Sequence, residues 1–131
     1  MLAPSLDTIA KLGEAVLESL PEPFRGLAGD IPVIVKDWPD SETLANLGID
    51  DALSLTGLYH AIPIGDRLGE ALPPVEPERI ELYRLPILFE WCNRNEPLEN
   101  VVFDVLTHEI GHHFGMDEAQ VMRMEGVEFD R

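Results

Sequence analysis

One stretch of this chain, residues 98–114, is predicted to form a helix that is apolar on most of its surface. Its apolar residues are spread around the helix rather than along one side: Val101, Val102, Val105, Leu106, Ile110 and Phe114. Among the ionisable residues that interrupt them are His108, Glu109 and His112. Because buried polar groups are costly without partners, we expect a largely buried helix whose polar residues bind something.

The spacing of these polar residues matches the pattern H-E-x-x-H. Residues four apart lie on one face of a helix, so the imidazoles of His108 and His112 can reach one Zn²⁺. Glu109 lies about 100° around the helix, where it can reach a water on the metal as a general base. A chain of this composition would contain the pattern by chance roughly once in a hundred cases. We therefore predict a zinc site.

A third ligand is expected after the helix, because a catalytic zinc usually has three protein ligands and one open position. Gly115 allows the chain to turn back, and Asp117 and Glu118 follow it. Glu118 lies ten residues after His108, at the last position of the extended motif. We predict Glu118 as the third ligand, with Asp117, a distant residue or a water as alternatives.

Hydrophobic periodicity and turn residues divide the rest of the chain into short elements. An amphipathic helix is predicted over 5–20, and Pro63 suggests an edge position for one strand. Strands are predicted at 31–36, 53–64 and 79–84. Short helices are predicted at 41–47, 87–93 and 119–124, with a surface loop at 65–78. With 131 residues, the chain is predicted to be a single domain, 1–131.

The charge balance narrows the classes of partner. The chain has 25 acidic and 9 basic residues and a net charge of −16, which repels nucleic acid and anionic membranes but attracts cations, including divalent metals. No apolar run approaches the ~20 residues of a membrane span, and the N-terminus lacks the features of a signal peptide. The single cysteine, Cys92, has apolar sequence neighbours that predict a buried thiol. These features together predict a cytoplasmic protein.

The motif and its setting resemble a known family. The similarity covers about residues 7–126 and includes HEIGHHFGMDE at 108–118. Three upstream segments add to it: Pro32–Val35, Leu55–Pro63, which is similar to a G-L-Y-x-G-x-P strand, and Arg79–Pro86, which is similar to an I-x-L-Y-R-x-P segment. In this order they resemble the minimal zincins, small bacterial zincin-like proteins regarded as possible metallopeptidases.

The resemblance implies an α+β fold. In such a fold, a small mixed sheet of about three strands packs on an N-terminal helix and on a C-terminal helix that carries HExxH. It also implies His108 and His112 as ligands, Glu109 as the base and Glu118 at the third-ligand position. The family usually has aspartate in place of Glu118 and glycine in place of Ala61.

Two functional hypotheses follow. The first is a zinc-dependent metallopeptidase, in which Glu109 activates zinc-bound water for peptide hydrolysis. Its peptide or protein substrate would bind along an edge strand at Gly57, Tyr59 and His60. The alternative is a non-catalytic zinc-binding module, a structural or protein-interaction domain, against which Glu109 argues because a structural zinc needs no base. A role as an inhibitor or a toxin–antitoxin partner has only the acidic surface in its favour, and the sequence does not indicate an oligomeric state.

Overall fold

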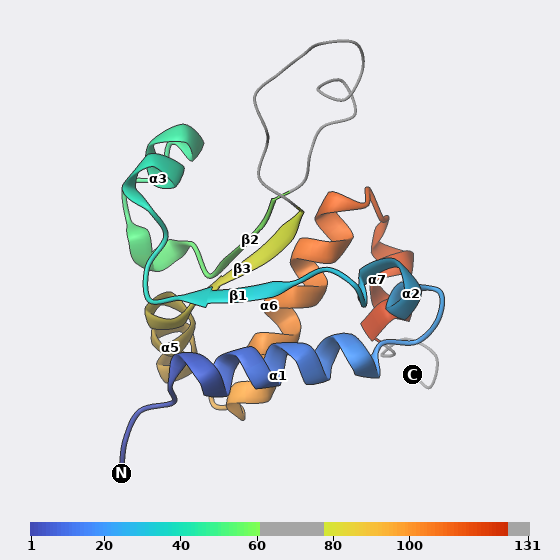
Figure 1. The fold of residues 1–131 in the computed structure, drawn as a ribbon, viewed down its shortest axis with the longest axis horizontal. Helices are drawn as coiled ribbons and strands as arrows, with labels where there is room; N and C mark the ends of the chain where they lie inside the picture. The colour runs from blue at the N-terminus through green and yellow to red at the C-terminus, as the bar shows by residue number, and fades with distance from the viewer. Residues whose placement is uncertain (61–77, 126–131) are drawn as a thin grey trace.

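A computed structural model describes residues 1–60 and 78–125, and within them three strands form a mixed sheet (Figure 1). The strands are β1 (Val33–Lys36), β2 (Gly57–His60) and β3 (Arg79–Tyr83). Their spatial order is β1-β3-β2, with β1 parallel and β2 antiparallel to β3. Among the described strands β3 is therefore central and β2 lies at an edge, as predicted for this segment.

Two long helices cover one face of this sheet. They are α1 (Leu6–Ser19), which lies below the strands in Figure 1, and α6 (Leu98–His113), which passes behind β1 in the same view. Ile9 of α1, Leu82 of β3 and Leu106 of α6 are fully buried in the core that they share. The N-terminal helix and the apolar C-terminal helix are thus confirmed, together with the α+β fold.

Shorter elements complete the described part of the fold: α2 (Phe24–Ala28), α3 (Ser41–Leu47), the 3₁₀ turn η1 (Ala52–Ser54), α5 (Arg84–Asn93) and α7 (Glu118–Glu125). The sequence did not predict α2, because five residues are too few for a periodic pattern. Helix α5 begins earlier than predicted because Pro86 lies in its first turn, where a missing N–H breaks no helical hydrogen bond.

The strand predicted over 53–64 is shorter than expected. Residues 57–60 form β2, whereas residues 52–54 form the 3₁₀ turn before it. Residues 61–64 and most of the predicted loop lie outside the described ranges.

Cys92 corrects one prediction. Its side chain is exposed in the last turn of α5, so the prediction of a buried thiol is wrong. Ile87, five residues earlier, is fully buried. Five residues correspond to about 140° around a helix, so Ile87 lies on a different side of α5 from Cys92. Phe89, another apolar neighbour in the sequence, is itself 50% exposed.

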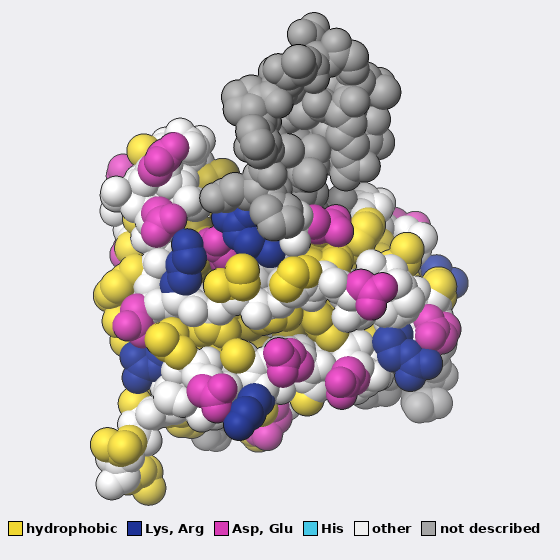
Figure 2. Space-filling model, viewed as in Figure 1, with side chains coloured by type: hydrophobic (Ala, Val, Ile, Leu, Met, Phe, Trp, Pro, Cys, Tyr) yellow, Lys and Arg dark blue, Asp and Glu magenta, His cyan; other side chains and the backbone are white. Residues whose placement is uncertain are grey.

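The surface shows the excess of acidic residues. In Figure 2, Asp and Glu side chains are distributed over the visible face, with Lys and Arg among them. Within the described ranges, no helix has the length and apolar character that a membrane crossing requires.

The sheet face opposite the core helices holds a buried carboxylate. Glu81 of β3 is 2% exposed and accepts hydrogen bonds from the Tyr83 hydroxyl at 2.7 Å and from Arg79 Nε at 2.8 Å. Lys36 Nζ of β1 and His60 Nε2 of β2 each lie 3.4 Å from one of its oxygens. Burial alone would raise the pKa of Glu81, but these hydrogen bonds and charges outweigh it and lower the pKa to about 2. One carboxylate therefore connects all three strands.

We predict that this carboxylate makes stability depend on pH in the acid range. Its folded pKa lies below the ordinary value of 4.5, so its contribution is complete above about pH 5 and is lost as the pH falls towards 2. The contribution is roughly 3 kcal/mol at most. The difference in unfolding free energy between wild type and Glu81→Gln, measured by urea denaturation, should shrink from pH 5 to pH 2.5. A difference that stays constant across this range would contradict the prediction.

Candidate metal centre

Helix α6 ends at a turn that the sequence predicts. Gly115 has a φ of +63°, and the amide of Met116 donates to the carbonyl of Gly111 at 2.9 Å. This is the hydrogen bond of a Schellman C-cap, in which glycine takes the left-handed conformation. The turn leads into α7, which packs against α6. The chain after the helix therefore returns towards the histidines.

Glu109 lies on the side of α6 that faces β2. The backbone N–H of Tyr59 donates to Oε1 of Glu109 at 3.2 Å. Glu109 is half-buried, whereas the neighbouring His108 is exposed. The two hydrogen-bonded residues are 50 positions apart in the sequence, so the bond forms only because β2 packs on α6.

The register of β2 explains why the Tyr59 amide is available to α6. Tyr83 N–H bonds the carbonyl of Thr56 at 3.0 Å, and antiparallel strands alternate hydrogen-bonded with non-hydrogen-bonded pairs. Tyr59 opposite Ile80 is therefore a non-hydrogen-bonded pair. The backbone groups of Tyr59, like those of Gly57, point away from β3 towards the outer edge of the sheet.

Gly57 allows β2 and α6 to approach closely. A Cβ at this position would stand 2.8 Å from Cγ1 of Val105 and 3.2 Å from the carbonyl oxygen of Glu81. Any other residue here would force a shift of the Val105 side chain, of the strand or of the helix. The absence of a side chain at Gly57 therefore permits the close approach of β2 and α6, across which the Tyr59 amide reaches Glu109.

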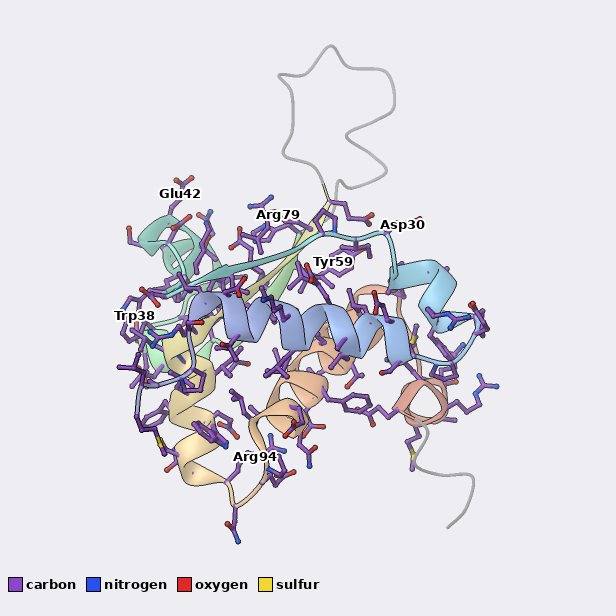
Figure 3. The ribbon with its side chains drawn as sticks, turned by 60° about the horizontal axis from the view of Figure 1, so that its bottom comes forward. Asp30, Trp38, Glu42, Tyr59, Arg79 and Arg94 are labelled. Atoms are coloured by element: carbon purple, nitrogen blue, oxygen red, sulfur yellow. The ribbon has the colours of Figure 1, made fainter. Side chains whose placement is uncertain are left out.

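The side chains of Tyr59 and His60 point to opposite faces of the sheet. The Tyr59 ring, labelled in Figure 3, meets Phe114 edge to face with ring centroids 5.8 Å apart, and its hydroxyl donates to Glu78. Burial, and next this hydrogen bond, raise the pKa of Tyr59. His60 faces Glu81 instead. Substrate binding by Gly57, Tyr59 and His60 remains a prediction.

A pocket of about 300 Å³ opens beside His108 and Glu109. It extends along α6 towards the start of the helix and is also bounded by α5 and by the segment before β2. Its lining residues are Ser54, Thr56, Glu90, Arg94, Asp104, Val105, His108 and Glu109. Of these residues, the sequence indicated only His108 and Glu109 as site residues. The residues of α5 and of the segment before β2 meet α6 only in the folded chain, so no local pattern points to them.

For the other two predicted ligands, the structure gives the position of the backbone. His112 lies one turn after His108 in α6, and Glu118 is the first residue of α7. The side chains of His112 and Glu118 are outside the described part of the structure. Among the side chains that are described, no three of His, Cys, Asp and Glu form a group that could hold a metal ion.

Asp117, the alternative third ligand, has a structural role at the start of α7. Its Oδ1 accepts the N–H of Gln120 at 2.8 Å, and Oε1 of Gln120 accepts the N–H of Asp117 at 2.9 Å. This reciprocal pair has the geometry of a capping box. The cap uses the Asp117 carboxylate, which favours Glu118 over Asp117 as a ligand.

A family model described as zincin-like metallopeptidase matches residues 28–127, which are 100 of the 131 residues. The matched range contains the three strands and both α6 and α7. A search of curated proteins found no match.

We predict that Gly57 and Val105 are energetically coupled, which a double-mutant cycle can measure. Gly57→Ala should cost about 1–3 kcal/mol, because the new Cβ overlaps Val105 Cγ1. In the Gly57→Ala/Val105→Ala protein that overlap is gone, so the double variant should lose less stability than the sum of the two single losses. Urea denaturation gives the energies, and a shift of the Tyr59 amide NMR signal in Gly57→Ala would report the displaced strand. Strictly additive losses would contradict contact between the two positions.

Proposed function

The chain belongs to the zincin-like metallopeptidase family, and from that premise we propose that it is a zinc-dependent peptidase with Glu109 as the general base. The observation that carries the proposal is the hydrogen bond from the Tyr59 amide, which holds the Glu109 carboxylate beside a pocket that His108 also lines. A zinc site with a purely structural role would need neither a fixed carboxylate next to its ligands nor a pocket beside them.

The donor set that we propose fits zinc. Two imidazoles, from His108 and His112, and one carboxylate, from Glu118, make a nitrogen-rich set of three, which leaves one position of a tetrahedral zinc open. The turn at Gly115 brings α7 back against α6, which supports Glu118 in this role. A zinc ion bound there would act as a Lewis acid and lower the pKa of water to about 7.

Within this proposal Glu109 moves the proton. Its carboxylate would accept a proton from the attacking water and return it to the leaving amine. The Tyr59 amide restricts rotation of the carboxylate, and because that donor is backbone, the orientation does not depend on another side chain. Peptides or proteins are the proposed substrates.

We expect one zinc ion per chain, with a distinct result for each proposed ligand. His108→Ala and His112→Ala should lose the metal, and Glu118→Ala should lose or weaken it. Asp117→Ala should keep the metal although it loses about 1 kcal/mol of stability with the helix cap. Zinc is measured by mass spectrometry after gel filtration, with unfolding curves to verify the fold. Full zinc in both histidine variants would refute the site. Loss in Asp117→Ala with retention in Glu118→Ala would make Asp117 the third ligand.

We expect Glu109→Gln to keep zinc and the fold but to lose hydrolysis by a factor of ~10²–10⁴, because an amide cannot accept the proton of water. The assay is cleavage of a mixed peptide library near neutral pH. Glu99→Gln, an exposed acid in the first turn of the same helix, is the matched control and should cleave like wild type.

Two outcomes would contradict this proposal. Equal cleavage by wild type and Glu109→Gln would point to a contaminating protease or to a mechanism without this base. No cleavage by zinc-loaded wild type would favour the alternative function, a non-catalytic zinc-binding module.

A further inference from the structure

The far end of the pocket beside His108 and Glu109 carries an ion network. Glu90 and Arg94 belong to α5 and its C-cap, and Asp104 belongs to α6 one turn before His108. Figure 3 shows Arg94 where α5 leads into α6. The same hollow thus joins the proposed reaction centre to a set of charged side chains.

The guanidinium of Arg94 is surrounded by carboxylates. It pairs with Asp104, lies 2.7 Å from Glu96 Oε2 and 3.9 Å from Glu90 Oε2. Hydrogen bonds to Asp104 and Glu96 raise the pKa of Arg94. Three carboxylates around one guanidinium leave a net negative charge, so an incoming anion would be repelled.

The carboxylates in this network are more exposed to solvent than the guanidinium. Glu90 and Asp104 are 46% and 48% exposed, whereas Arg94 is 24% exposed. The carboxylates are therefore more accessible to a ligand than the guanidinium is. Val105 and Thr56 line the same pocket and offer apolar atoms to a hydrocarbon chain. Carboxylates at the end of a partly apolar pocket match a long side chain with a cationic end.

Resting on the proposed peptidase function, we propose that this pocket receives a lysine or arginine side chain close to the scissile bond of the substrate. Glu90 and Asp104 are then the residues that determine specificity. The volume of about 300 Å³ is sufficient for one extended side chain. The net charge of −16 would also attract basic peptides over acidic ones.

The first test is cleavage of a random octapeptide library by the zinc-loaded protein, with cut sites identified by mass spectrometry. Lys and Arg should be enriched at one position near the cut, and Asp and Glu should be depleted there. Glu90→Gln should reduce the enrichment by about threefold, the usual scale of a partly exposed ion pair. Glu99→Gln removes an equal charge on α6 outside the pocket and should leave the enrichment unchanged. Glu90 is preferred to Asp104 for this test because Asp104 neutralises Arg94.

The second test measures binding without hydrolysis. Zinc-loaded Glu109→Gln protein is titrated with a blocked heptapeptide, Ala-Gly-Leu-Lys-Leu-Gly-Ala, and with versions that carry norleucine or glutamate in place of lysine. The lysine peptide should bind most tightly, and its advantage should shrink as salt rises from about 0.05 to 0.5 M. Adding Glu90→Gln should also reduce this advantage, whereas adding Glu99→Gln should not.

The two tests separate this inference from the proposed function. Cleavage with no preference for Lys or Arg, or with a preference for acidic residues, overturns the inference and leaves the peptidase standing. No cleavage, but tighter binding of the lysine peptide that depends on Glu90, contradicts the peptidase and supports the cationic pocket. Absence of both cleavage and selective binding contradicts both.

Discussion

Where β2 meets α6, the backbone of Gly57 leaves no room for a Cβ against Val105. This close approach places the edge of the sheet against the helix that carries Glu109. At that separation the amide of Tyr59 reaches Glu109, so a backbone donor at the edge of the sheet is satisfied by a side chain of the helix. The same hydrogen bond orients the carboxylate. The hydrogen bond from Tyr59 to Glu109 therefore both joins the sheet edge to the helix and orients the proposed base.

The sheet separates two carboxylates with different roles. Glu81 lies on the face opposite the core helices, where side chains from all three strands lower its pKa and hold it ionised. Glu109 lies beyond the edge of β2, with a backbone donor on one side and a pocket on the other. The first stabilises the sheet in its folded form. The second has the position that proton transfer to a substrate in the pocket would require.

The site forms at the junction of short elements. α6 contributes His108, Glu109 and Asp104, whereas α5 and its C-cap contribute Glu90 and Arg94. These short elements thereby form a pocket next to the proposed base. Because Arg94 is already paired with carboxylates, the charge of the pocket that reaches solvent is acidic.

Local features of the sequence were sufficient to predict several elements. Apolar spacing located α1 and α6, β-branched residues located β1, and Gly115 marked the end of α6, because each depends on neighbours within one or two turns. The i, i+4 spacing of His108 and His112 likewise requires only a helix. The candidate histidine ligands could therefore be identified from the sequence, without knowledge of how the elements pack.

Tertiary structure alone decided how these elements meet. The hydrogen bond from Tyr59 to Glu109 joins residues 50 positions apart, and the ion pair of Arg94 with Asp104 depends on how α5 packs against α6. Cys92 has apolar neighbours in the sequence but faces solvent, because helical rotation turns it away from the core. The sequence by itself determined which side chains could do the chemistry. Packing decided which of them share a pocket, since contacts between distant segments leave no local pattern.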